Sequence, residues 1–118
     1  MAICYLGLGG NIGDSFAVME KTVRAIAKLD QVWEVEVSRP FLTTPVSSVE
    51  QRDYLNAVCR LRTSLTPTEL FSKLEEIESA MGKVAKPKEE PRVIDIDMLF
   101  YGQKRMESDK LSLPHPRW

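Results

Sequence analysis

The pattern of apolar and polar residues along the chain predicts strands and helices in turn. Apolar residues run together, or alternate with polar ones, as in strands. Four segments have this pattern: 2–8, 32–38, 54–63 and 94–100. Apolar residues recur at helical spacing in two others, from residue 15 to about residue 29 and from 67 to 81. We therefore expect four main strands and two helices.

In chain order these elements are strand, helix, strand, strand, helix and strand, and a small hairpin arm follows the last strand. This order predicts an α+β fold of the ferredoxin-like βαββαβ kind. Its antiparallel sheet carries both helices on one face. The other face is open, so loops and polar strand residues can build a site there.

The same periodicity predicts which side chains each element buries. The first helix should bury a stripe consisting of Phe16, Met19, Val23, Ile26 and Ala27. The second strand should bury alternate side chains, namely Trp33, Val35 and Val37. The last strand should have an apolar face made of Ile94, Ile96, Met98 and Phe100. Glu78 lies off the apolar stripe of the second helix, so its simplest interpretation is a solvated side chain.

Turn and capping residues mark the ends of the helices. Asp14 or Ser15 is suited to cap the first helix, after a glycine-rich turn over 9–14 that either approaches a ligand or only tightens the connection. Thr66, followed by a proline and by Glu69, forms a capping-box pattern for the second helix, and Gly82 should end it.

Two segments are expected to be loops. Residues 39–51 contain two prolines and are long for a plain connection, which is typical of a functional or mobile loop. Residues 83–91 are rich in lysine and glutamate and have no apolar period. Their lysines either close over a polyphosphate or belong to a solvated connection.

Composition narrows the function classes. The chain has 118 residues, enough for one domain over 1–118, and a net charge of −1, which leaves no broad basic surface for nucleic acid. We expect no membrane association, because no apolar run is long enough to cross a bilayer and no signal-peptide pattern occurs. Cys4 and Cys59 fit no metal or redox spacing, so reduced core thiols and a cytoplasmic location are expected, with a structural disulfide as the weaker alternative.

Asp95 and Asp97 carry the clearest candidate chemistry. Side chains two apart on a strand share a face, with Cα atoms roughly 6–7 Å apart. Two carboxylates at that spacing repel each other unless a cation lies between them, and Mg²⁺ binds one or two carboxylates together with substrate phosphates. Mn²⁺ suits the same ligands. Arg92 could bring a charged fork to those phosphates. Two solvated acids on a half-exposed strand are the alternative.

Three other polar or aromatic residues bear on a possible binding site. Asn56 offers a donor and an acceptor to the edge of a heterocycle, and Tyr54 could stack on one. Equally, Asn56 could be a sheet-end residue satisfied by the neighbouring loop. His115 is the only histidine and stands between two prolines, so we expect an exposed side chain in extended backbone.

Five ordered motifs resemble one family, the 6-hydroxymethyl-7,8-dihydropterin pyrophosphokinases of folate biosynthesis. They run from the first strand to the last residues, so the resemblance covers the whole chain. The motifs are Gly9-Gly10-Asn11-Ile12-Gly13-Asp14, Phe41-Leu42-Thr43-Thr44-Pro45, Asp53-Tyr54-Leu55-Asn56-Ala57, Pro91-Arg92-Val93-Ile94-Asp95-Ile96-Asp97 and Leu113-Pro114-His115-Pro116.

The resemblance implies transfer of pyrophosphate from ATP to the hydroxymethyl group of the pterin, with release of AMP. It implies that Asp95 and Asp97 bind two Mg²⁺ ions and act in catalysis together with Arg92. The pterin pocket implied by the motifs consists of Thr43, Pro45, Tyr54 and Asn56. The implied ATP-binding residues are Lys83, Arg92 and His115, with Glu78 and Lys110 as weaker candidates. Fusion to, or association with, another folate-pathway enzyme is also implied.

The chain departs from the family pattern in several places, of which the change at Gly10 is mild. Glu89-Glu90 stands where the family has an Arg-Trp-Gly run, and Lys83 replaces an arginine. Family members also continue beyond the Pro-His-Pro motif, so we expect this chain to lack that segment. These departures leave an alternative function, a truncated or inactive ligand-binding or interaction domain on the same scaffold. Calorimetry with an ATP analogue and the pterin, followed by an AMP-release assay, distinguishes the two.

Overall fold

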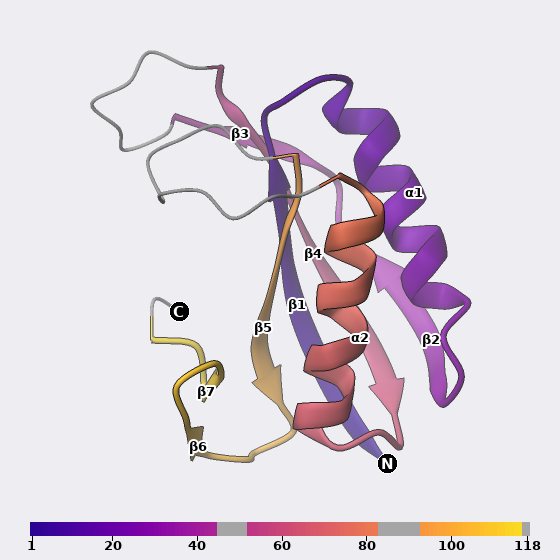
Figure 1. The fold of residues 1–118 in the computed structure, drawn as a ribbon, viewed down its shortest axis with the longest axis vertical. Coiled ribbons are helices and arrows are strands. Elements are labelled where there is room, and N and C mark those ends of the chain that lie inside the picture. The colour runs from indigo at the N-terminus through magenta and orange to yellow at the C-terminus, as the bar shows by residue number, and fades with distance from the viewer. Residues whose placement is uncertain (45–51, 83–92, 117–118) are drawn as a thin grey trace.

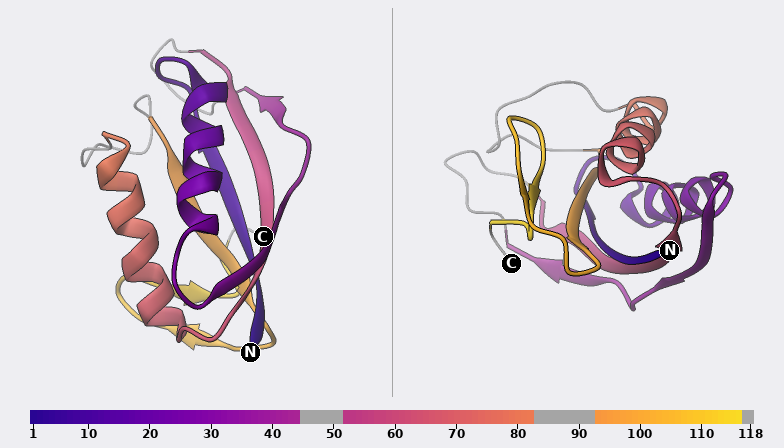
Figure 2. Two further views of the ribbon diagram at one scale, coloured as in Figure 1. Left: turned by 90° about the vertical axis from the view of Figure 1, so that its right-hand side faces the viewer. Right: turned by 90° about the horizontal axis from the view of Figure 1, so that it is seen from below.

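The computed structural model describes residues 1–44, 52–82 and 93–116. One antiparallel sheet forms the body of the molecule, and its strands lie in the order β2 (Val32–Val37), β4 (Tyr54–Thr63), β1 (Ala2–Gly10) and β5 (Asp95–Tyr101). A short strand, β3 (Phe41–Thr43), also pairs with β4. Helices α1 (Ser15–Ala27) and α2 (Pro67–Ala80) cover one face, as Figures 1 and 2 show. The expected ferredoxin-like arrangement is therefore confirmed.

Local signals at the helix ends have the predicted effect. The Asp14 carboxylate accepts a hydrogen bond from Ala17 N, so Asp14 is the cap of α1. The capping box of α2 is complete between Thr66 and Glu69. Gly82 follows the end of α2 with φ of +95°, a conformation that glycine adopts without strain. The first helix ends at Ala27, two residues earlier than expected.

The core lies between the sheet and the two helices. Alternate residues of β4 are buried as predicted (Leu55, Ala57, Cys59 and Leu61). Cys4 and Cys59 are both free and buried, which contradicts the disulfide alternative. In α1 the predicted stripe is only partly right, because Phe16 is 65% exposed and Ala27 is exposed, whereas Thr22 is buried. Thr22 satisfies its hydroxyl by donating to Val18 O at 2.7 Å.

Strand β2 does not bury the face that its alternation predicted. Trp33 and Val37 are 43% and 47% exposed. The pairing of β2 with β4 is irregular between Trp33 and Glu36, and Glu34 has φ of +52°. This left-handed residue interrupts the regular alternation of an edge strand. Part of the expected 39–51 loop is also wrong, because β3 forms there by pairing with β4.

Strand β5 contains a bulge that changes its faces. Tyr5 pairs with Phe100 and Leu6 with Met98, so Leu99 is an extra residue in β5. Beyond the bulge, Phe100 lies on the open face, where it is 39% exposed and makes an edge-on contact with the Tyr5 ring. The expected burial of Phe100 is therefore wrong.

A small two-stranded sheet, β6 (Met106–Glu107) and β7 (Ser112–Leu113), follows β5 and confirms the expected hairpin arm. It lies beside β5, away from β2 (Figure 2). Leu111 and Leu113 of this arm join the main core. Within the described residues, no helix has the length and apolar character needed to span a membrane.

Candidate active site

Two glycines of β1 form the floor of the candidate site on the open face of the sheet. Gly9 pairs with Asn56 of β4 on one side and with Asp95 of β5 on the other. Gly7 pairs in the same way with Asp97 of β5. Directly paired residues of neighbouring strands point to the same face. The glycines therefore form a strip of β1 without side chains of its own, between an amide on β4 and two carboxylates on β5. The Leu99 side chain packs over the Gly7 end of this strip.

Asp95 and Asp97 share this open face, as predicted. Ile96, between them, points into the core and is 6% exposed. The Asp97 side chain is 55% exposed, whereas Asp95 is half-buried. The pair lies on an edge strand, and the edge is covered at separate points by α2 and by the segment after β7.

The two carboxylates fit a magnesium site of the kind that substrate phosphates complete. Among the described residues, no group of three or more histidine, cysteine, aspartate or glutamate side chains converges as a metal cage would require. Mg²⁺ is usually held by one or two carboxylates, with waters and substrate phosphates as its other ligands. Asp95 and Asp97 supply that minimal donor set, with oxygen atoms only.

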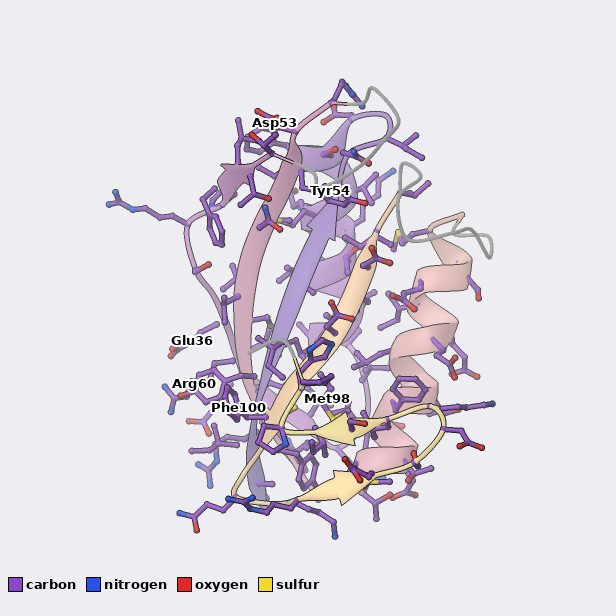
Figure 3. All side chains as sticks on the ribbon, turned by 90° about the vertical axis from the view of Figure 1, so that its left-hand side faces the viewer. Glu36, Asp53, Tyr54, Arg60, Met98 and Phe100 are labelled. Carbon is purple, nitrogen blue, oxygen red and sulfur yellow. The ribbon has the colours of Figure 1, made fainter. Side chains whose placement is uncertain are left out.

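The structure brings Asn56 and Thr43 together. The side-chain amide of Asn56 donates to Thr43 Oγ1 at 2.8 Å, and also to Tyr54 O at 3.1 Å and Phe41 O at 3.3 Å. This arrangement agrees with the interpretation of Asn56 as a sheet-end residue satisfied by its neighbours. It also fixes the amide, so that the carbonyl oxygen Oδ1 lies above Gly9. Tyr54 lies at the same end of the open face, far from Phe100 and Arg60 (Figure 3).

His115 lies beside Asp97, and its expected exposure is wrong. Its side chain is 23% exposed, and Nε2 lies 3.9 Å from Asp97 Oδ1. That distance is too long for a hydrogen bond but short enough for an ion pair when the imidazole is protonated. The cause is non-local: His115 N donates to Leu99 O at 2.9 Å, which holds the segment after β7 against β5.

Glu78 is not a solvated residue of α2. Its Oε2 accepts a hydrogen bond from Ile96 N at 2.7 Å, and the side chain is half-buried. Lys110 lies between β6 and β7 and is exposed, and within the described part of the chain no hydrogen bond or ion pair joins it to the other candidates. Pro45, Lys83 and Arg92 lie outside the described residues.

Sequence reasoning missed two features near the site. The first is the pair Gly7 and Gly9, because glycines two apart in a strand leave one face of that strand without side chains of its own. The other feature is a clamp between Asn11 and Arg52. The Arg52 guanidinium donates to Asn11 O at 3.0 and 3.2 Å and to Gly13 O at 2.7 Å, while the Asn11 amide donates to Arg52 O at 2.8 Å.

The fold and site define a class: a small α+β protein whose open sheet face carries a carboxylate pair across a glycine strip from an amide. The chain belongs to the 7,8-dihydro-6-hydroxymethylpterin-pyrophosphokinase (HPPK) family, whose model matches residues 5–118. This match confirms the resemblance drawn from the five motifs.

Named relatives agree with this family. The chain is 33% identical over 115 residues to the 2-amino-4-hydroxy-6-hydroxymethyldihydropteridine pyrophosphokinase of Bacillus subtilis, covering 98% of this chain and 69% of the relative. It is 39% identical over 114 residues to the protein of the same name from Synechocystis, covering 95% and 57%. It is 35% identical over 115 residues to the bifunctional protein FolKE of Lactococcus lactis, where it covers 98% of this chain and spans 33% of the relative.

Proposed function

We propose that this chain transfers pyrophosphate from ATP to 6-hydroxymethyl-7,8-dihydropterin in folate biosynthesis. Membership of the HPPK family and the names of the relatives support the reaction. The observation that carries the proposal for the site is the glycine strip, with Asn56 on one side and Asp95 and Asp97 on the other. On this face a flat heterocycle could bind beside Asn56, next to a polyphosphate beside the two aspartates.

The pterin is assigned to the Asn56 side of the strip. The carbonyl oxygen of Asn56 accepts from an N–H on the pterin edge, and the Thr43 hydroxyl holds the amide in that orientation. Tyr54 contributes an aromatic ring at the same end of the face. Pro45 is proposed for the same pocket on the resemblance alone.

The triphosphate is assigned to the side of Asp95 and Asp97. These carboxylates would hold two Mg²⁺ ions, which when bound neutralise phosphate charge and orient the phosphate groups. His115 is proposed as an ATP contact because it lies against Asp97, at the border of the same strip. Arg92 and Lys83 are proposed for the phosphates, with Lys110 as the weaker nucleotide-side candidate. Glu78, the other weak candidate of the resemblance, accepts from the backbone of Ile96 and is not assigned to the nucleotide.

The chemistry requires positioning more than covalent participation by the protein. The hydroxymethyl oxygen of the pterin forms a bond to the β-phosphorus of ATP while the bond from that phosphorus to the α,β-bridging oxygen breaks. The products are the pterin diphosphate and AMP, and the hydroxyl proton passes to water. The two sides of the strip supply the alignment of nucleophile and leaving group.

Two further proposals concern the location of the protein in the cell and its association with other enzymes. Two free thiols in the core support a cytoplasmic location. Association or fusion with another folate-pathway enzyme is supported by relatives named as a bifunctional protein and as the folic acid synthesis protein fol1 of Schizosaccharomyces pombe.

An AMP-release assay with Asp95→Ala and Asp97→Ala tests the proposed reaction. Each variant should lower turnover by orders of magnitude at saturating Mg²⁺ and ATP, while circular dichroism shows an unchanged fold. Asp109→Ala, an exposed aspartate of the β6–β7 hairpin, is the control and should keep wild-type turnover. Wild-type turnover in the Asp95/Asp97 double variant would remove the metal-site assignment. Binding of the pterin and an ATP analogue without AMP release by the native protein would favour a non-catalytic binding domain.

A further inference from the structure

Helix α2 contacts the backbone of β5 directly between the two aspartates. Ile96 N donates to Glu78 Oε2 at 2.7 Å, and Ile96 is the residue that separates Asp95 from Asp97. Glu78 stands in the last turn of α2, so a single side chain joins the end of the helix to the start of the strand.

The hydrogen bond replaces a missing neighbouring strand. Strand β5 is at the edge of the sheet, with β1 on its inner side only. An outward-pointing amide of an edge strand has no ladder partner. Because Ile96 is 6% exposed, water is largely kept from its surroundings, and leaving the amide without an acceptor would be costly. Glu78 supplies that acceptor.

The peptide groups on both sides of Ile96 determine the positions of the Asp95 and Asp97 backbone atoms from which the two carboxylate side chains project. The Ile96 N–H belongs to the peptide plane shared with Asp95, and the next peptide plane leads to Asp97. A bond that fixes this amide therefore fixes the pleat on which both side chains stand. Groups that orient metal ligands commonly change metal affinity by about 10- to 100-fold when they are removed.

We propose that Glu78 is a positioning residue that holds the carboxylate pair Asp95–Asp97 in the spacing that divalent cations require. This inference rests on the proposed function, because it takes the pair as the cation site. Glu78 acts through the backbone of Ile96. The property that matters is the reach of its acceptor oxygen.

Three substitutions separate reach from charge. Glu78→Gln keeps the reach and an acceptor oxygen but removes the charge. Glu78→Asp keeps the charge but is one methylene shorter, and Glu78→Ala removes both. Glu75→Gln is the matched control, because it removes the same charge from an exposed position one turn earlier in α2.

Two measurements report on the proposal without turnover. The first is binding of Mn²⁺ in the presence of α,β-methylene-ATP, followed by electron paramagnetic resonance. The second is hydrogen exchange of the Ile96 amide, followed by nuclear magnetic resonance in the ligand-free protein. Glu78→Gln and Glu75→Gln should keep Mn²⁺ affinity within about 3-fold, whereas Glu78→Asp and Glu78→Ala should lose about 10-fold or more. Ile96 exchange should accelerate in the Asp and Ala variants only.

Other outcomes overturn the inference. Wild-type Mn²⁺ affinity in Glu78→Asp with a loss in Glu78→Gln would mean that charge matters and reach does not. Affinity for AMP without metal should stay unchanged, so a loss of AMP affinity in every Glu78 variant would make Glu78 a nucleotide contact. If Glu78→Ala does not fold, the comparison of Glu78→Gln with Glu78→Asp still tests the inference. Asp95→Asn and Asp97→Asn distinguish a failure of the proposed function from a failure of this inference. Unchanged Mn²⁺ binding in these two variants would contradict the proposed function. Lost Mn²⁺ binding in them, together with wild-type binding in Glu78→Asp, would contradict this inference alone.

Discussion

Gly9 of β1 faces Asn56 of β4 so closely that a Cβ at Gly9 would lie 3.2 Å from Asn56 Oδ1. The same Cβ would lie 3.7 Å from Leu55 O and 3.8 Å from the Tyr54 ring. The absence of a side chain at Gly9 therefore leaves space for the Asn56 carbonyl to point over the strip. The backbone of Gly9 is therefore part of the candidate site, together with the polar side chains around it.

Replacing Gly9 by alanine should weaken pterin binding more than nucleotide binding. The new methyl group displaces the Asn56 carbonyl from its position above β1, so the proposed hydrogen bond to the pterin is lost or bent. We expect about a 10-fold loss of affinity for 6-hydroxymethylpterin, corresponding to about 1.4 kcal/mol. Isothermal titration calorimetry with the pterin and with α,β-methylene-ATP measures both affinities.

Gly7→Ala is the control for this prediction. It lies on the same strand and face, and the atoms nearest to its Cβ would belong to the flexible Leu99 side chain, at 3.4 Å and beyond, which is ordinary contact. It should leave the pterin affinity within about 2-fold of wild type. Equal losses of pterin affinity in both variants would mean that the strip matters as a whole and that Gly9 has no special relation to Asn56.

The buried thiols should make the protein less stable at high pH. Burial raises the pKa of Cys4 from 9.0 to about 12, with a smaller contribution from nearby Cys59, and burial raises the pKa of Cys59 from 9.0 to about 11. A raised pKa in the folded state favours the protonated thiol. The resulting stability is fully present below pH 9.0 and is lost as the pH rises toward 11–12.

Urea denaturation between pH 8 and 10.5 tests this dependence. Above pH 9 each thiol should lower the free energy of unfolding by about 1.4 kcal/mol per pH unit. Cys4→Ala and Cys59→Ala should each show a shallower slope than the wild type, because each lacks one of these groups. Parallel slopes in all three proteins would mean that the thiols do not titrate differently on folding.

Local signals account for the features that sequence reasoning predicted. The capping box of Thr66 and Glu69, the Asp14 cap and the alternation of β4 each involve residues within a few positions of one another. Their physical causes are local hydrogen bonds and the two-residue period of a strand, so they can be recognised without knowing the fold. The shared face of Asp95 and Asp97 follows from the same period.

The features that sequence reasoning missed depend on residues far apart in the chain. Phe100 changes faces because the bulge at Leu99 is defined by pairing with β1. His115 is covered because its backbone bonds to Leu99, and Glu78 is half-buried because it reaches Ile96 in another element. No periodicity encodes such contacts. They lie at the candidate site, where the edge of the sheet meets segments that follow or precede it.

Removing the N-cap of α2 should destabilise the protein in a pH-dependent way. Thr66→Ala deletes the hydroxyl that accepts from Glu69 N at 3.2 Å and should cost about 1 kcal/mol, or about 4 °C in melting temperature. Hydrogen bonds from Thr66, chiefly from its backbone N–H, lower the pKa of Glu69 below its ordinary 4.5. A lowered pKa gives stability that is present above pH 4.5 and is lost as the pH falls through the native pKa.

Thermal melts at pH 7 and at pH 3 check both parts of this prediction. Glu69→Gln should lose stability relative to the wild type at pH 7, and the difference should shrink as the pH falls and the wild-type carboxylate takes up a proton. Thr68→Ala, an exposed threonine in the same turn, should change the melting temperature little. A difference between Glu69→Gln and the wild type that stays constant with pH would contradict the role of the carboxylate charge.

The Arg52 clamp should stabilise the turn between β1 and α1 through the shape of its guanidinium. One planar group donates both to Asn11 O and to Gly13 O, and Asn11 is 3% exposed. Lysine keeps the charge but offers a point donor that cannot span two carbonyls in the same plane. Arg52→Lys should therefore lower the free energy of unfolding by about 1 kcal/mol.

Arg105→Lys, at an exposed position after β5, is the control and should cost less than about 0.5 kcal/mol. Urea denaturation measures both, and hydrogen exchange of the Gly13 and Asp14 amides shows whether the loss is confined to this turn. Equal stability of the two lysine variants would mean that the charge of Arg52, and not its fork, holds the turn.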